Sequence, residues 1–188
     1  MEPLSCVAQG IQLLDFEPKS SILVIGPGAI GLMFVAALHA LGVEQVHLAG
    51  RNPLRLAEGA RLGANTINVA DIPVGDPHLF DMVIECTGQV EVWEKSIDYV
   101  RRGGTLMLFG GCPGGTRASF DTKKLHYDQI TILSPFHFGT KAVQTAREWL
   151  LNDLDLSGLI SGVRELAEGA SVFEDLKAGK ALKYVFTP

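Results

Sequence analysis

Ser21-Ile-Leu-Val-Ile-Gly-Pro-Gly-Ala-Ile-Gly31 is the stretch that decides the fold of this chain. Residues 21–25 are a short apolar, β-branched run, a pattern typical of a buried central strand. Gly26, Gly28 and Gly31 follow with G-x-G-x-x-G spacing, and a nearly all-apolar segment over 32–41 is long enough for a helix. A strand that turns sharply into a helix directs backbone N–H groups outward from the helix N-terminus, where the helix dipole favours an anion. The stretch therefore predicts a dinucleotide-binding turn, which we favour over a plain tight strand–helix turn.

Each glycine of this turn has its own predicted role. Gly26 permits the tight turn, Gly28 removes the Cβ that would hold a pyrophosphate off, and Gly31 lets the helix lie close on the strand. The same cofactor-binding turn is completed by Pro27, Ala29 and Ile30.

The composition indicates one soluble α/β domain. The chain has 188 residues, enough for a sizeable core, and is 47% hydrophobic and 20% charged. Its net charge of −5 and the lack of a basic run argue against nucleic acid as a partner. The longest apolar stretch, 30–41, is too short to span a bilayer, and the N-terminus lacks the regions of a signal peptide. The cysteines are Cys6, Cys86 and Cys112; they are far apart and form no C-x-x-C. This pattern predicts a cytoplasmic protein without a zinc knuckle.

Segments with strand patterns recur along the chain and alternate with helical patterns. We therefore expect an α/β fold with a doubly wound parallel six-stranded sheet, the Rossmann NAD(P)-binding fold, in the order 3-2-1-4-5-6. In that order the ligand lies at the carboxyl ends of strands one and four. After the first strand, the strands are predicted at Gln45–Gly50, Thr66–Val69, Asp81–Cys86, Thr105–Phe109 and Gln129–Ser134.

The remaining segments are predicted from their turn and capping residues. Residues 1–19 form an irregular lead-in, and 70–80 form a loop. The helix after the fourth strand is expected to carry Arg101 and Arg102 at its C-terminal end and Gly103 as its stop. A short helix near 171–178 and a final strand over 182–186 complete the chain.

The end of the second strand bears on the choice between NAD and NADP. An NAD-binding fold places an acidic residue there, about 20 residues past the last glycine, to bind the ribose hydroxyls. Gly50 stands in that place, and Arg51 and Arg55 follow it. A glycine gives room to a 2′-phosphate and a guanidinium can bind it, so the sequence favours NADP, with NAD as second choice. The alternative is that both arginines are solvated side chains at a helix start.

Two later turns are candidates for the nicotinamide end of the cofactor. Cys86, Thr87 and Gly88 follow the fourth strand, and Phe109, Gly110 and Gly111 follow the fifth. Their backbone would flank the nicotinamide, and for the second turn a glycine-rich loop is the open alternative. Glu85 is interpreted as capping a neighbouring helix or pairing with an arginine, not as a base. The five histidines form no site by spacing; only His126 and His137 lie near turns expected to face the cofactor.

Together these residues resemble one family, the zinc-type medium-chain dehydrogenases, the group of alcohol, sorbitol and threonine dehydrogenases. The matching pieces span essentially the whole chain: residues 2–6, 26–31, 81–88, 102–105 and 179–183. The resemblance implies an N-terminal catalytic domain before this point. It therefore divides the chain into a lead-in from that domain (1–19), a Rossmann domain (20–156) and a tail that packs back towards the catalytic domain (157–188).

The resemblance also assigns roles to single residues. Glu2 matches a position at the catalytic zinc or its bound water, and Lys183 matches a basic residue that contacts cofactor phosphate. Phe136 and His137 match the turn that approaches the nicotinamide ring. Gly50 departs from the family's usual aspartate. The other zinc ligands of the family have no counterpart here, and zinc takes three protein ligands, so we expect zinc in the full-length parent and not in this chain alone.

The sequence thus predicts the NAD(P)-binding domain of a zinc-dependent alcohol or polyol dehydrogenase, inactive by itself. Its partners would be the dinucleotide, a small alcohol or polyol in the parent, and a second copy of the chain, with no membrane. The homodimer is expected because the apolar stretch 131–138 lies at the edge of the sheet. The alternatives are a zinc-independent member similar to quinone reductases and a non-catalytic NADP-binding module.

Overall fold

A parallel sheet of six strands is the centre of the fold, as seen in the computed structural model, which describes residues 1–72, 79–152 and 154–188. The strands run in the order β3-β2-β1-β4-β5-β6, so the predicted doubly wound order is confirmed. Their bounds are β1 (Ser21–Ile25), β2 (Gln45–Gly50), β3 (Asn65–Asn68), β4 (Phe80–Glu85), β5 (Val100–Leu108) and β6 (Thr131–Leu133).

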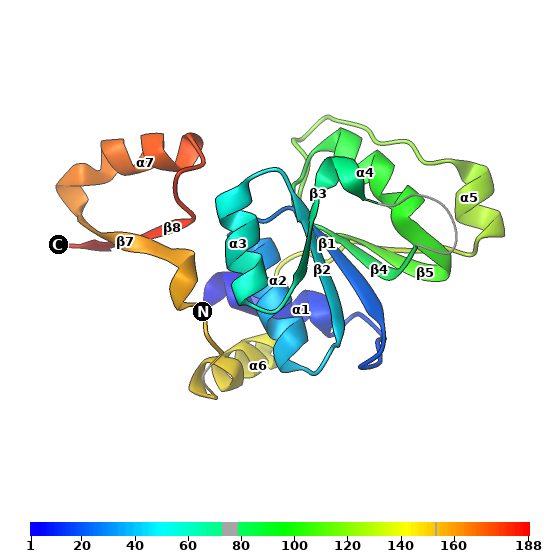
Figure 1. Cartoon of the computed structure of the whole chain (residues 1–188), viewed down its shortest axis with the longest axis horizontal. Helices are drawn as coiled ribbons and strands as arrows, with labels where there is room; N and C mark the ends of the chain where they lie inside the picture. The colour runs from blue at the N-terminus through cyan, green and yellow to red at the C-terminus, as the bar shows by residue number, and fades with distance from the viewer. Residues whose placement is uncertain (73–78, 153) are drawn as a thin grey trace. The chain divides into compact units, whose positions relative to one another are not determined.

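Helices cover both faces of this sheet (Figure 1). On one side lie α1 (Glu2–Ile11), α2 (Ala29–Ala40), α3 (Pro53–Arg61) and α6 (Thr140–Leu151); on the other lie α4 (Val90–Ser96) and α5 (Thr122–Tyr127). Because both faces are covered, the central strand is apolar after Ser21: Ile22, Leu23 and Val24 have no exposed surface. Helix α2 is buried almost all round, which explains why its sequence shows no polar face.

The first helix corrects an expectation. Residues 1–19 were expected to be irregular, but 2–11 form α1, which packs against α2 and α6. Gln12, just after α1, donates a hydrogen bond from Nε2 to Thr145 Oγ1 of α6 at 3.0 Å. The buried side chains follow the helical spacing that marks a packed face: Leu4, Val7, Ala8 and Ile11.

The start of β5 corrects a second expectation. Arg101, Arg102 and Gly103 were expected to end the preceding helix, but α4 stops at Ser96 and these residues lie in β5. The ladder to β4 shifts register there, since Phe80 pairs with Val100 and Met82 with Thr105. The extra residues form a bulge, and Gly103 adopts a left-handed φ of 72° that suits glycine.

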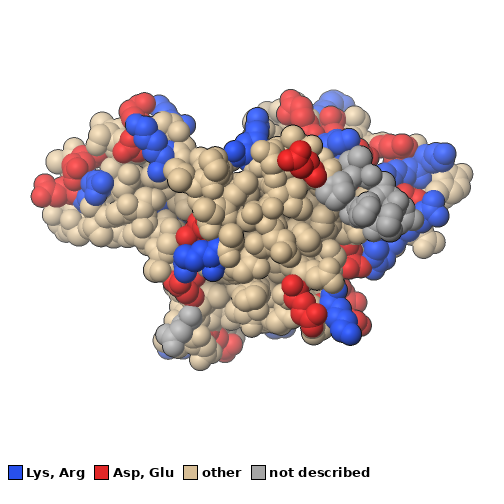
Figure 2. Space-filling model, viewed as in Figure 1, with Lys and Arg blue, Asp and Glu red and all other residues tan. Residues whose placement is uncertain are grey.

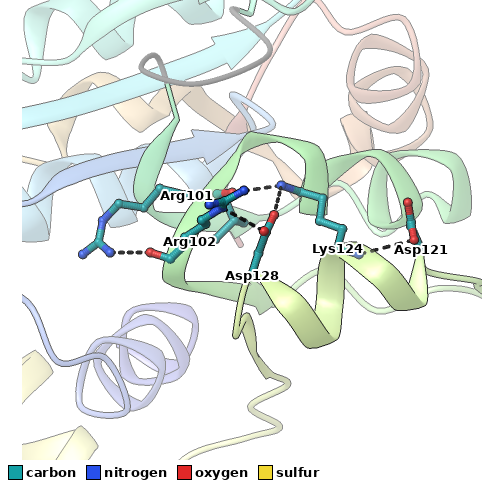
Figure 3. Close-up of polar contacts among 6 residues, drawn as sticks. Arg101, Arg102, Asp121, Lys124 and Asp128 are labelled. Carbon is teal, nitrogen blue, oxygen red and sulfur yellow. Dashed lines mark hydrogen bonds and ion pairs between the residues drawn. The ribbon is translucent and has the colours of Figure 1, made fainter.

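Helix α5, which was not predicted, and the residue after it hold this bulge in place. Asp128, after α5, accepts a hydrogen bond from the Gly103 N–H at 2.7 Å through its main-chain oxygen. Its carboxylate lies between Arg102 Nε at 3.1 Å and Lys124 Nζ at 3.3 Å (Figure 3). Arg102 is largely exposed, so that pair contributes little; the contact with the mostly buried Lys124 is less screened.

A second compact unit, Asp155–Pro188, follows the first, Met1–Leu154. It consists of β7 (Ile160–Glu165), α7 (Gly169–Lys177) and β8 (Lys183–Thr187), with β7 and β8 paired in parallel. The predicted helix near 171–178 and last strand over 182–186 are confirmed within two residues. Strand β7 was not predicted, because Ser161-Gly162 within it favours a turn and leaves no continuous apolar run.

The described surface mixes charges of both signs, as Figure 2 shows for one face. Within the described ranges, no helix is both long and apolar enough to cross a membrane. The predicted loop at 70–80 falls partly on 73–78, which lie outside the described residues; a short 3₁₀ turn at Val69–Asp71 precedes them.

Gly31→Ala is expected to destabilise the fold by about 1–3 kcal/mol, because a Cβ there would lie only 2.1 Å from the main-chain oxygen of Gly26. Gly28→Ala is the matched control: a Cβ at position 28 meets nothing within 4 Å, and its φ of −82° suits any residue. Urea denaturation of both variants measures the difference. Equal stability of the two would contradict the close helix–strand approach.

Candidate functional site

An open groove of about 480 Å³ lies at the carboxyl ends of β1, β2 and β4. This is the place where the chain crosses from one side of the central strand to the other, which is where open α/β sheets bind ligands. The groove is lined by Ile25, Gly26, Pro27, Gly28, Ala49, Gly50, Arg51, Asn52, Arg55, Val69, Cys86, Thr87, Gln89 and Val92.

The glycine turn forms the floor of the groove, and its glycines are needed for different reasons. Gly26 has a φ of +107°, and a Cβ there would come within 2.9 Å of the Thr87 methyl group. Its N–H donates to the Ala49 oxygen at 2.9 Å, which ties the turn to β2. Above Gly28 the space is open, so the backbone at the start of α2 faces the groove directly. The first N–H groups of a helix have no acceptor within it, and they favour an anion at this point.

The end of β2 supplies the positive charge of the groove. Arg51 is exposed and Arg55 half-buried, and both line the groove. Asn52 begins α3, since its Oδ1 accepts the N–H groups of Leu54 at 3.0 Å and Arg55 at 3.2 Å. This cap holds the first turn of α3, and so the base of Arg55, against the groove. Asn52 also lines the groove itself.

A buried carboxylate organises the turn after β4. Glu85 has no exposed surface and accepts the N–H groups of Thr87 at 2.5 Å and Gly88 at 3.2 Å. The expectation that it caps a neighbouring helix or pairs with an arginine is therefore wrong within the described residues: it binds the turn that follows its own strand. Its main-chain oxygen also accepts the N–H groups of Phe109 at 3.0 Å and Gly110 at 2.9 Å.

The turns after β4 and β5 are thereby joined. A Cβ on Gly88 would lie 2.5 Å from the Gly111 oxygen, so the two backbones touch. Trp93 of α4 donates from Nε1 to the Gly110 oxygen at 2.8 Å, which fixes the second turn from the helix side. The predicted pair of turns is therefore brought together, with Gly88, Phe109, Gly110 and Gly111 lying next to Cys86 and Thr87 of the groove.

Burial sets the ionisation of the groups in this region. Desolvation raises the pKa of Glu85, and the hydrogen bonds from Thr87, Gly88 and Trp93 act in the opposite direction. Burial also raises the pKa of the Cys86 thiol well above its usual range, and the charge of Glu85 adds to this. Cys86 is therefore a neutral thiol at physiological pH and contributes an uncharged wall to the groove.

Other predicted residues lie outside the lining of the groove. Ala29 and Ile30 are in the first turn of α2. Phe136, 85% exposed, and His137, at a φ of 58°, follow β6. His126 is an exposed residue of α5.

Lys183 begins β8 in the second unit.

The described residues do not fit a zinc site. Glu2, the predicted metal residue, is exposed at the start of α1, and Cys6 Sγ donates to its Oε1 at 3.6 Å. No third ligand accompanies them: within 1–72, 79–152 and 154–188, no group of three His, Cys, Asp or Glu side chains could hold a metal ion. A catalytic zinc takes three protein ligands, so these two residues do not make one.

Comparison with curated proteins and protein families agrees with this geometry. A family model described as zinc-binding dehydrogenase matches residues 29–152. D-arabinitol dehydrogenase 1 of Uromyces fabae is 27% identical over 202 residues, covering 100% of this chain and 57% of the relative. D-altritol 5-dehydrogenase of Agrobacterium fabrum is 34% identical over 137 residues, covering 70% of this chain and 41% of the relative.

Solved structures share the fold. A proposed zinc-binding dehydrogenase of Sinorhizobium meliloti, bound to NADP, matches with a TM-score of 0.91 and 24% identity, over 100% of this chain and 58% of the other. L-idonate 5-dehydrogenase of Escherichia coli matches with a TM-score of 0.86 and 22% identity, over 100% of this chain and 55% of the other.

The fold and the groove define a Rossmann domain of the dinucleotide-binding type. The chain belongs to the zinc-binding dehydrogenase family, as the resemblance of its motifs implied, and it spans about half the length of the curated relatives that it matches.

Glu85→Gln is expected to change how stability depends on pH. Because the folded protein raises the pKa of Glu85, it favours the protonated carboxyl, and wild type loses stability as the pH rises from the ordinary carboxyl range through the raised value. The variant cannot ionise and lacks this loss. Urea denaturation of both proteins over a pH series measures the effect, and a stability difference that is constant with pH would show that folding leaves the pKa of Glu85 unshifted.

Proposed function

We propose that this chain binds a nicotinamide dinucleotide, NADP(H) in preference to NAD(H), as the cofactor-binding part of a zinc-dependent alcohol or polyol dehydrogenase. One observation carries the preference: Arg51 and Arg55 line the groove at the end of β2, where Gly50 stands instead of an acidic residue. A carboxylate there would repel a 2′-phosphate, whereas a guanidinium attracts it.

In this proposal the groove holds the cofactor in three parts. The pyrophosphate lies over Gly28 at the N-terminus of α2, where the space is open and N–H groups point outward. The adenosine end lies towards Arg51 and Arg55, and the nicotinamide end towards the turns of 86–88 and 109–111. When bound, the cofactor supplies a hydride acceptor or donor at its nicotinamide ring. The chain's own part is to bind and orient it, and the buried Glu85 keeps the two turns in position.

The substrate class is proposed from the relatives. D-arabinitol dehydrogenase 1 and D-altritol 5-dehydrogenase are named for sugar alcohols, which favours a polyol for the parent enzyme. Four residue roles that the resemblance implies stay predictions: Glu2 as a metal residue, Lys183 as a phosphate contact, and Phe136 and His137 as nicotinamide contacts. So do the homodimer, the cytoplasmic location and the division at residues 19 and 156.

A second candidate function is binding without catalysis. The lack of a three-ligand metal group among the described residues favours it for this chain taken alone. A zinc-independent reduction similar to that of quinone reductases is the remaining enzymatic alternative. We therefore derive no step through a metal.

The 188-residue chain is expected to bind NADPH but to oxidise no alcohol, because the groove is present and the residues that the structure describes contain no three-ligand metal group. NADPH fluorescence on titration measures binding, and NADP reduction with a polyol panel and added zinc measures turnover. Gly28→Ala serves as control: its methyl group would occupy the pyrophosphate position and weaken binding about tenfold without unfolding the chain. Failure of wild type to bind NADPH or NADH would refute the proposed function, and zinc-dependent turnover would refute the second candidate.

Arg51→Ala is expected to lower NADPH affinity about tenfold or more and to leave NADH affinity nearly unchanged. A charge-assisted hydrogen bond to phosphate is worth about 1.5–3 kcal/mol, and only NADPH carries the 2′-phosphate. Dissociation constants for both cofactors are compared at one salt concentration, since the phosphate contact is screened. Arg117→Ala, an exposed arginine outside the groove lining, is the matched control.

The NADP preference is wrong if wild type binds NADH more tightly. Equal weakening of both cofactors by Arg51→Ala would show instead that Arg51 packs on the adenine or stabilises the start of α3.

A further inference from the structure

The end of β2 is packed closely against the glycine turn. A Cβ built on Gly50 would lie 2.3 Å from Cγ and 2.4 Å from Cδ of Pro27, far inside any allowed contact. The clashing atoms belong to a proline ring, which is closed onto its own backbone and cannot swing aside as a long side chain can. Position 50 therefore admits only glycine while Pro27 keeps its place.

The Pro27 ring is held in that place from both sides. Before it, Gly26 donates its N–H to the Ala49 oxygen at 2.9 Å, and its left-handed φ and its contact with Thr87 leave the turn little freedom. After it, Gly28 is already the N-cap of α2. Since β1 and β2 pair in register from Ser21 and Gln45 to Ile25 and Ala49, position 50 follows directly beside the turn.

We propose that Pro27 is a cofactor-selectivity residue of this groove. Its ring fills the space that a side chain at position 50 would need, and so excludes the carboxylate that would bind the ribose hydroxyls of NAD(H). Because no carboxylate fits at position 50, Arg51 and Arg55 determine which adenosine ribose, with or without the 2′-phosphate, the groove prefers. The inference rests on the proposed dinucleotide binding, but its steric part concerns the folded chain without any ligand.

This view differs from the simpler one in which Gly50 only leaves room for a 2′-phosphate. If space for the 2′-phosphate were the only reason for glycine at position 50, Gly50→Asp alone would change the cofactor preference from NADPH to NADH. If the Pro27 ring blocks the side chain, conversion needs Pro27→Ala as well. With that change Cγ and Cδ are gone, and the remaining Cβ, at 3.4 Å, is at the edge of ordinary contact.

The test is a double-mutant cycle of wild type, Pro27→Ala, Gly50→Asp and the double variant. Urea unfolding is measured without cofactor, and dissociation constants for NADPH and NADH are measured at one salt concentration. Gly50→Ala in both backgrounds is the matched control, because it adds the Cβ without the charge.

We expect Gly50→Asp and Gly50→Ala to lower the unfolding midpoint in the Pro27 background and much less in the Pro27→Ala background. We expect the double variant to bind NADH about tenfold more tightly than Gly50→Asp does, the gain of a carboxylate bonded to the ribose.

Two results would overturn the inference while leaving dinucleotide binding intact. One is equal stability loss from the position-50 substitutions in both backgrounds, and the other is full NADH conversion by Gly50→Asp alone. If none of the proteins binds either cofactor, the proposed function is refuted, and the selectivity role of Pro27 is refuted with it. The unfolding measurements would still show whether the Pro27 ring contacts a side chain at position 50.

Discussion

The main constraint in this fold is the close approach of helix α2 to the end of strand β1. Gly31 lies so near the main-chain oxygen of Gly26 that a methyl group does not fit between them. Because the helix starts this close to the strand, its N-terminus opens at the carboxyl edge of the sheet. The hydrogen bond from Gly26 to Ala49 then brings the end of β2 against the same turn. The groove, its positive side and the Pro27–Gly50 contact all follow from that geometry.

The other end of the groove depends on a buried charge-bearing group. A carboxylate without exposed surface is unfavourable unless donors surround it, and Glu85 obtains them from the N–H groups of Thr87 and Gly88. The same residue accepts two main-chain N–H groups from the turn after β5 through its own oxygen. Two loops that carry many small residues are thereby held rigid by one side chain and one peptide group.

Several parts of this arrangement could be predicted from the sequence. The glycine spacing, the apolar run of β1 and the capping pair Asn52-Pro53 each determine local structure, and their signals are short and strong. The strand order followed from the alternation of strand and helix patterns. Helix α1 carries the same kind of signal at Leu4, Val7 and Ile11 and could have been found from it, whereas the β5 bulge could not, since Arg102 and Gly103 also suit the end of a helix.

The sequence by itself determined the class of fold, the place of the groove and several of the residues that line it, because these depend on local periodicity and on turn chemistry. Only the tertiary structure decided what Gly50 and Glu85 do. Their contacts, with the Pro27 ring and with the turns after β4 and β5, depend on how closely separate strands approach. Such distances arise from packing the whole sheet, and no pattern within one segment encodes them.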